Sequence, residues 1–184
     1  MINIDKYITG EYKLDENYYY HAFEKNSMIP ILKDGIKCTF LQSKKNKGGY
    51  NGAFYVSICK KTDFIKSAYK LYGDDKYDMF ILSSSIRAIK THKNGIADLF
   101  ADTIVPVRSS VYDDEFQVFL KIAPSYIKGI RLSELKDKDD LVNLKNKLLI
   151  LKKYNIDIPV YDFSLEESGI IRKINKAKIL CEIQ

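Results

Sequence analysis

Apolar and polar positions along the chain change their period several times, and each period predicts one kind of element. Alternating positions and short apolar runs rich in β-branched and aromatic residues predict strands, whereas apolar residues repeating every three and four positions predict helices. The predicted strands are Tyr18–Phe23, Ile36–Leu41, Ala53–Ile58, Met79–Leu82, Ile86–Ile89, Thr103–Val107, Glu115–Ile122, Ile127–Leu132 and Ile156–Tyr161.

Helix signals separate some of these strands. Asn26 or Ser27 can cap a helix that runs through Lys33, with Pro30 in its first turn and Gly35 as its stop. The other predicted helical segments are Thr62–Tyr72, a short turn at Gly95–Phe100, Leu141–Tyr154 and a last helix opened by the capping box Ser164-Leu165-Glu166-Glu167. The Lys-, Gly- and Asn-rich stretch Gln42–Gly52 has no apolar period and predicts a loop.

Mixed strands with segregated helices predict an α+β fold rather than a doubly wound parallel sheet. With 184 residues, the chain fits one domain, which we expect to span 1–184. Residues 17–132 hold the strand-rich core, and 133–184 form a C-terminal helical appendage. We expect the appendage to pack on the core, because neither of its helices could bury an apolar stripe alone.

Composition narrows the class of protein. Apolar residues make up 46% and aromatic residues 12% of the chain, which excludes a disordered protein. No apolar run is long enough to span a bilayer, and the N-terminus lacks the sections of a signal peptide. We therefore expect a cytoplasmic protein without membrane contact, unless a specialised secretion system exports it. Cys38, Cys59 and Cys181 have no spacing suited to zinc and are interpreted as reduced thiols.

The net charge of +6 favours anionic partners through long-range attraction. Lys supplies 26 of the 30 basic residues, since Arg occurs only at positions 87, 108, 131 and 172. Because Arg is the usual residue for bidentate phosphate contacts, this distribution favours solubility over specific nucleic-acid binding. Neither a P-loop nor a Rossmann glycine pattern is present, and no clustered ligand set indicates a metal.

Four separated fragments carry the most informative pattern. In chain order they are Tyr20-His21-Ala22, Gly52-Ala53-Phe54-Tyr55-Val56-Ser57, Ser67-Ala68-Tyr69 and Asp114-Glu115-Phe116-Gln117-Val118-Phe119. Together they resemble the core pieces of an ADP-ribosyltransferase of the His-Tyr-Glu class, the class of diphtheria toxin and the poly-ADP-ribose polymerases. The resemblance covers about residues 17–132 and implies a split β-sheet core that binds NAD. The stretches 126–130 and 158–161 are similar to the sequel found in small bacterial mono-ADP-ribosyltransferases.

The resemblance implies roles for particular residues. Glu115 would hydrogen-bond a ribose hydroxyl and stabilise the oxocarbenium-like transition state as the catalytic residue. His21 would donate a hydrogen bond to the adenosine-side ribose. The backbone of Ala22 would pair with the nicotinamide amide, and Ser67 would add a second hydrogen bond to it. Alternation along the strand places Glu115 and Gln117 on one face.

Two assignments stay open at this stage. Phe54 and Tyr55 compete for one side of an aromatic sandwich around the nicotinamide ring, and Tyr69 and Tyr72 compete for the other, with core packing an alternative for each. Asp113 precedes Glu115 by two positions and would help select the acceptor, the alternative being a solvated loop acid.

The sequence therefore predicts a mono-ADP-ribosyltransferase that consumes NAD and modifies a macromolecule, with protein favoured over nucleic acid as acceptor. Such a protein would act as a bacterial toxin, effector or defence protein. One alternative is a catalytically silent member of the same fold that binds a nucleotide, nucleic acid or protein. Another is an RNA 2′-phosphotransferase, which the shortage of His and Arg disfavours.

Overall fold

The computed structural model of the chain describes residues 3–13, 18–23, 25–38, 41, 55–60, 78–90, 115–132, 135, 137–162 and 170–183. Its strands are β1 (Ile8–Lys13), β2 (Tyr19–Phe23), β3 (Ile36–Lys37), β4 (Tyr55–Cys59), β5 (Asp78–Leu82), β6 (Ile89–Lys90), β7 (Glu115–Phe119), β8 (Lys121–Ile122), β9 (Ile127–Arg131), β10 (Val160–Asp162) and β11 (Ile170–Ile174). The α-helices are α1 (Met28–Asp34), α4 (Lys138–Lys153) and α5 (Lys176–Glu182), joined by the 3₁₀ turns Ile4–Tyr7, Lys25–Ser27 and Pro124–Tyr126.

Nine of the described strands form one sheet in the order β1-β11-β10-β9-β5-β2-β4-β7-β6. Its strands pair antiparallel except β9 with β10, which run parallel. The strands β3 and β8 form a separate two-stranded sheet. This mixed α/β arrangement with a mostly antiparallel sheet is compatible with the expected α+β class.

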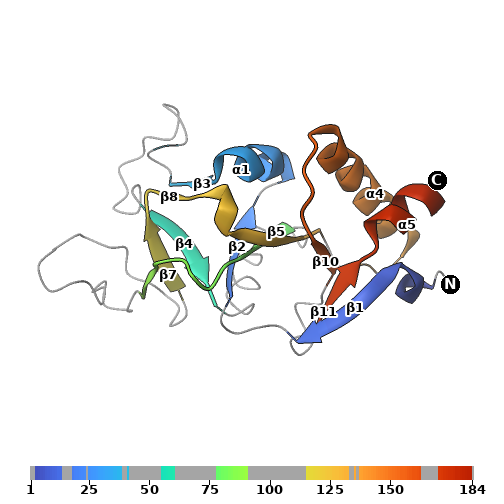
Figure 1. Cartoon of the computed structure of the whole chain (residues 1–184), viewed down its shortest axis with the longest axis horizontal. Coiled ribbons are helices and arrows are strands. Elements are labelled where there is room, and N and C mark those ends of the chain that lie inside the picture. The colour runs from blue at the N-terminus through green and yellow to red at the C-terminus, as the bar shows by residue number, and fades with distance from the viewer. Residues whose placement is uncertain are drawn as a thin grey trace, which may run out of the picture.

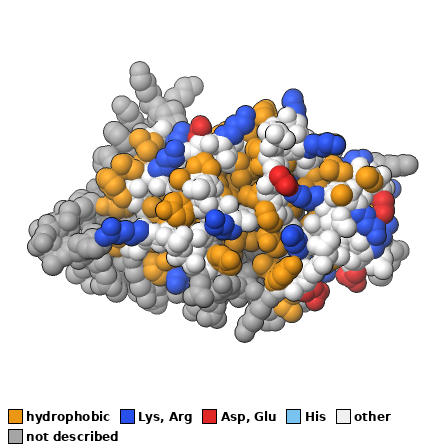
Figure 2. All heavy atoms as spheres, viewed as in Figure 1, with side chains coloured by type: hydrophobic (Ala, Val, Ile, Leu, Met, Phe, Trp, Pro, Cys, Tyr) orange, Lys and Arg blue, Asp and Glu red, His pale blue; other side chains and the backbone are white. Residues whose placement is uncertain are grey.

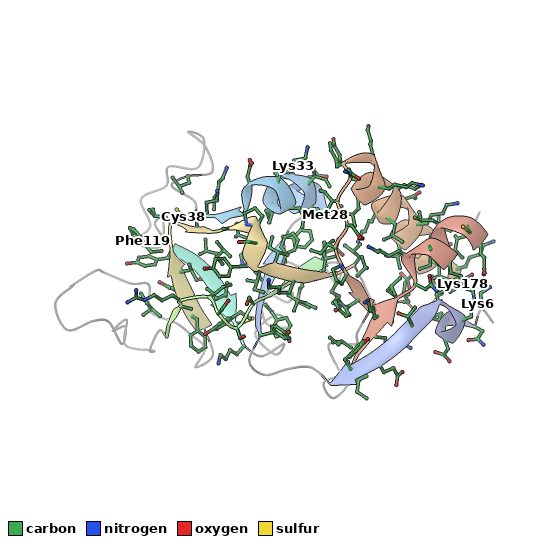
Figure 3. All side chains as sticks on the ribbon, viewed as in Figure 1. Lys6, Met28, Lys33, Cys38, Phe119 and Lys178 are labelled. Carbon is green, nitrogen blue, oxygen red and sulfur yellow. The ribbon has the colours of Figure 1, made fainter. Side chains whose placement is uncertain are left out.

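The three described α-helices lie on one side of the large sheet (Figure 1). A main core forms between them and the sheet, from residues of β2, β4, β5 and β9 together with Met28, Leu141, Leu144 and Ile179. Met28 lies between α1 and the strands (Figure 3). A second cluster lies on the opposite face of the sheet and consists of Tyr20, Cys59, Met79, Ile81 and Ile171, with Tyr18, Ala22 and Tyr161 packed against it.

Helix α4 follows its sequence signals closely. Leu141, Leu144, Leu148 and Leu151 are buried, as the predicted stripe requires. A capping box of Asp137 and Asp140 begins the helix, because each side chain accepts a hydrogen bond from the other residue's backbone N–H. Lys147 Nζ lies 2.7 Å from both carboxylate oxygens of the buried Asp78, which ties α4 to the centre of the sheet.

Helix α1 ends where the sequence predicts. Gly35 has φ +87°, and a Cβ built on it would lie 2.2 Å from the carbonyl oxygen of Ile122. Only glycine fits this position, both because of its backbone angles and because β8 approaches so closely. The Ser27 side chain, in contrast to the prediction, makes no capping hydrogen bond; the 3₁₀ turn Lys25–Ser27 leads into the helix instead.

Several strand boundaries differ from the prediction. The strand expected over 115–122 is two strands, because Leu120 has φ +60° and breaks the extended backbone between β7 and β8. The strands expected over 36–41, 86–89 and 156–161 shrink to β3, β6 and β10. The predicted elements at 62–72, 95–100 and 103–107, the loop at 42–52 and the capping box at 164–167 lie outside the described residues.

The C-terminal segment is only partly helical. It contributes α4 and α5, whose apolar residues belong to the main core, whereas β10 and β11 extend the large sheet itself. The last described helix, α5, begins at Lys176, where Asn175 caps it, and residues 170–174 before it form β11. The edge strand β1, which pairs with β11, was not predicted.

We expect Gly35→Ala to lower the free energy of unfolding by at least about 2 kcal/mol, because the new methyl group meets a backbone carbonyl and a glycine-only conformation. Urea unfolding measures the change. Gly10→Ala is the matched control, since its Cβ would meet only the exposed Tyr12 side chain at 3.2 Å. Equal losses in the two variants would contradict the close approach of β8 to Gly35.

Candidate functional site

The three strands that carry His21, Tyr55 and Glu115 are consecutive neighbours in the sheet, in the order β2-β4-β7. Tyr20 pairs with Cys59, and Cys59 pairs with Glu115, so one row of residues crosses all three strands. With strands about 4.8 Å apart, the ends of this row are separated by about 10 Å, a span that one small ligand can bridge. Fragments that lie far apart in the sequence therefore meet on three adjacent strands near the β6 edge of the sheet.

The pairing between β2 and β4 is interrupted. Tyr20↔Cys59 is the only residue pair between them, whereas β2 pairs with β5 along its whole length. Continued pairing would place Ala22 opposite Ser57. Instead, Nδ1 of His21 lies 2.8 Å from the carbonyl oxygen of Ser57. The His21 side chain thus takes the place of a ladder hydrogen bond and marks the point where the sheet divides.

This contact fixes the state of the imidazole. A carbonyl oxygen only accepts, so Nδ1 carries the proton and donates it to Ser57. Burial lowers the pKa of His21 below its usual value, and the hydrogen bond to Ser57 opposes that shift only in part. At neutral pH the ring is therefore uncharged, and Nε2 carries a lone pair that can accept a hydrogen bond. Within the described residues, Nε2 has no hydrogen-bond partner.

The backbone of Ala22 faces the interrupted stretch. The carbonyl oxygen of Tyr20 faces β4, where it accepts a hydrogen bond from Cys59 Sγ at 3.5 Å. In an antiparallel sheet, the N–H and C=O of one residue point to the same neighbour and alternate along the strand, so those of Ala22 also point toward β4. Because the ladder has already ended, Ala22 has no strand partner on that side within the described residues. In that part of the chain its N–H and C=O are left available to another molecule.

Tyr55 lies at the start of β4 and is buried. Its ring meets that of Phe119 edge to face, with centroids 5.6 Å apart and planes inclined by 62°. Burial raises the pKa of the Tyr55 hydroxyl. Phe119 is 55% exposed and lies at the end of the sheet away from α4 and α5 (Figure 3). The ring of Tyr55 therefore has a packing partner, and stacking on a ligand would have to use its other side.

Glu115 is the first residue of β7 and pairs with Cys59. Positions 20, 59 and 115 alternate to the face of the second cluster, whereas position 21 alternates to the face of the main core. His21 and position 115 therefore lie on opposite faces of the sheet, on two strands that are both neighbours of β4. Phe54, Ser67, Tyr69, Tyr72 and Asp113 lie outside the described residues, so the choice between Phe54 and Tyr55 stays open.

Two further polar groups lie on β4 and β7, and neither of them was assigned a role from the sequence. One is the carbonyl group of Ser57, which orients His21. The other is Gln117, which pairs with Ser57 across the strands and is 1% exposed. Its Oε1 is the one buried side-chain polar atom in the described part of the chain without a hydrogen-bond partner. Such an atom costs about 1–3 kcal/mol of stability. A polar residue at a buried position of an apolar strand is the signal that could have singled it out.

Other features of the described residues lie away from these strands. A pocket of 310 Å³ between α4 and α5 is lined by Leu148, Leu151, Lys152, Asn155, Ile156, Asp157, Lys176, Ala177 and Leu180. The described ranges contain no group of three or more His, Cys, Asp or Glu side chains arranged to hold a metal ion. None of the helices described has the length and apolar character needed to cross a membrane.

Comparison with known proteins gives no family assignment, since neither a family model nor a curated protein matches the chain.

The lowered pKa of His21 predicts a pH dependence of stability. Below about 6.5, the usual pKa of a His in an unfolded chain, the unfolded protein takes up a proton that the folded protein does not. The free energy of unfolding should therefore fall as the pH drops from about 7.5 to about 5.5, and His21→Gln should reduce this fall. Urea unfolding at several pH values tests it. His92→Gln, which changes the other His of the sequence, serves as the control. An unchanged pH dependence in His21→Gln would show that the ring titrates normally.

Proposed function

We propose that the chain is an NAD-dependent mono-ADP-ribosyltransferase with the split-sheet fold of the His-Tyr-Glu class. The observation that carries the proposal is the arrangement of β2, β4 and β7. These strands bear three of the four fragments that resemble the class, they are neighbours in the sheet, and the ladder between two of them ends at His21. Local sequence resemblance gives no reason for the three strands to be adjacent, so their adjacency is independent support.

The reaction breaks the bond between the nicotinamide nitrogen and C1′ of the ribose. The bonding electrons leave with nicotinamide, and the ribose passes through an oxocarbenium-like state that a nucleophile of the acceptor traps while losing its proton. A carboxylate beside the ribose stabilises the positive charge that develops there. Glu115 is the proposed catalytic residue, because its strand position lies in the row that begins at Tyr20, next to the interruption.

His21 and Ala22 are the proposed binding residues on β2. Since Nδ1 of the neutral ring donates to Ser57, Nε2 would accept a hydrogen bond from a ribose hydroxyl. This reverses the donor role that the resemblance implied. The backbone N–H and C=O of Ala22, which have no partner on β4, match the two halves of a carboxamide, which accepts through its oxygen and donates through its nitrogen. The expected contact with nicotinamide needs no side chain at this position.

The proposed acceptor is a macromolecule, with protein favoured over nucleic acid. On the face shown in Figure 2, Lys and Arg side chains are scattered among apolar ones rather than gathered into one basic patch. Nucleic-acid-binding surfaces instead concentrate basic residues along a face or groove. A bacterial toxin, effector or defence protein is the proposed biological role, and Asp113 is the proposed acceptor-selecting residue.

We expect Glu115→Gln to lower nicotinamide release from NAD by a factor on the order of one hundred or more, because the amide keeps the size of the side chain but loses its charge. Chromatographic measurement of nicotinamide gives the rate. Glu11→Gln is the matched control, since Glu11 is an exposed carboxylate on the edge strand β1 and should leave the rate unchanged. If the wild-type protein binds NAD without releasing nicotinamide, the silent binding member of the fold is the correct description.

His21→Ala should weaken NAD binding by about tenfold, because it removes the proposed ribose contact. Calorimetric titration and the melting temperature, measured on the same sample, distinguish binding from packing. A structural role alone predicts a lower melting temperature with unchanged NAD affinity. That result would remove His21 from the proposed site.

A further inference from the structure

Gln117 has no function in the site described so far, and its environment is unusual. It lies in the middle of β7 and is 1% exposed, yet Oε1 has no hydrogen-bond partner in the described part of the chain. Its neighbours in the same strand, Phe116 and Val118, pack against the main core. A buried amide is normally retained only where something satisfies it, so the acceptor without a partner indicates a group that comes from outside the described residues.

The register places Gln117 beside the interrupted ladder. Ser57 directs its carbonyl group toward β2, where His21 binds it, so its backbone does not bond to β7. Ser57 and Gln117 therefore form a non-hydrogen-bonded pair, in which opposite Cα atoms are about 4.5 Å apart and side chains approach most closely. The same row, extended across the interruption, reaches Ala22. Gln117 thus lies in the same row as Ser57, one strand beyond the stretch in which β2 and β4 are unpaired.

The chemistry of the missing partner follows from the atom itself. A carbonyl oxygen accepts only, so the partner must bring an N–H or O–H. In the proposed site, the nicotinamide carboxamide accepts through its oxygen from the Ala22 N–H, and one of its two N–H groups donates to the Ala22 carbonyl. The hydroxyl of Ser67, to which the resemblance gives a further hydrogen bond, can donate to the carboxamide oxygen, so the second N–H of the carboxamide is left for another acceptor. Gln117 Oε1 can accept a hydrogen bond from this second N–H without losing an existing one, because it has no partner in the described part of the chain.

We propose that Gln117 is a specificity residue that accepts a hydrogen bond from the second carboxamide N–H of bound nicotinamide. This inference rests on the proposed function and adds to it the group that recognises the amide nitrogen. Gln117 takes no part in breaking the glycosidic bond.

The test combines a protein change with a ligand change. Gln117→Met keeps an unbranched side chain of similar length but removes the acceptor, and Gln117→Leu provides a second apolar replacement. The ligands are NAD and 3-acetylpyridine adenine dinucleotide, in which a methyl group replaces the amide nitrogen. Titrations in a Glu115→Gln background prevent consumption of NAD. Asn143→Leu, which changes an exposed amide on α4, is the matched control.

We expect Gln117→Met and Gln117→Leu to bind NAD about five- to tenfold more weakly, with the affinity for the acetylpyridine analogue unchanged. Their melting temperatures should equal or exceed that of the parent protein, because an unsatisfied buried acceptor has been removed. The control should leave both affinities unchanged.

Three outcomes would overturn the inference. Equal weakening of both ligands would show that Gln117 acts through packing, and unchanged NAD affinity would show that it does not contact the carboxamide. A clear fall in melting temperature in both variants would show that the amide has a structural partner within the chain. In each of these cases the proposed function survives, whereas it fails with the inference only if the parent protein binds no NAD.

Discussion

The hydrogen bond from His21 Nδ1 to the carbonyl oxygen of Ser57 determines how β2 and β4 meet in the sheet. In a continuous ladder, that carbonyl would accept from a backbone N–H of β2. Because the imidazole satisfies it instead, β2 and β4 can separate after the single pair Tyr20↔Cys59 without leaving the Ser57 carbonyl unpaired. The same contact fixes the tautomer of His21 and leaves Nε2 as an acceptor. The His21 side chain therefore both replaces a ladder hydrogen bond between β2 and β4 and provides a hydrogen-bond acceptor, Nε2, at the place where the ladder ends.

An interrupted ladder needs support from the rest of the fold. On one side of the interruption, β2 pairs with β5 over five residue pairs, and β5 is buried from Asp78 to Leu82. On the other side, β4 pairs with β7 over five residue pairs. Phe23 stacks on Phe80 with centroids 4.0 Å apart, and the Asp78–Lys147 ion pair holds α4 against β5. The two halves of the sheet are thus each well paired, and the interruption is confined to the place where they meet.

The sequence pattern predicted the elements whose formation depends mainly on their own residues. The stripe of α4, the glycine stop of α1 and the existence of strands at β2, β4, β5, β7 and β9 follow from periodicity and backbone chemistry. The break at Leu120 was not predictable, because its positive φ is imposed on a residue type that does not favour it. Strand β1 escaped because it depends on pairing with β11, more than 150 residues later. The contact between His21 and Ser57 likewise depends on strand order, which periodicity does not contain.

The unfavourable features of the described sheet occur together. A shortened ladder, a His whose pKa is lowered by burial and a buried acceptor without a partner all lie on β2, β4 and β7. Each reduces stability, and a fold selected for packing alone would replace Gln117 with an apolar residue such as those beside it in β7. His21 and Gln117 flank Ser57 on its two sides, and Ala22 faces it across the gap. Such a concentration of uncompensated polar groups around one residue is typical of a binding site, because a ligand supplies the partners that the protein lacks.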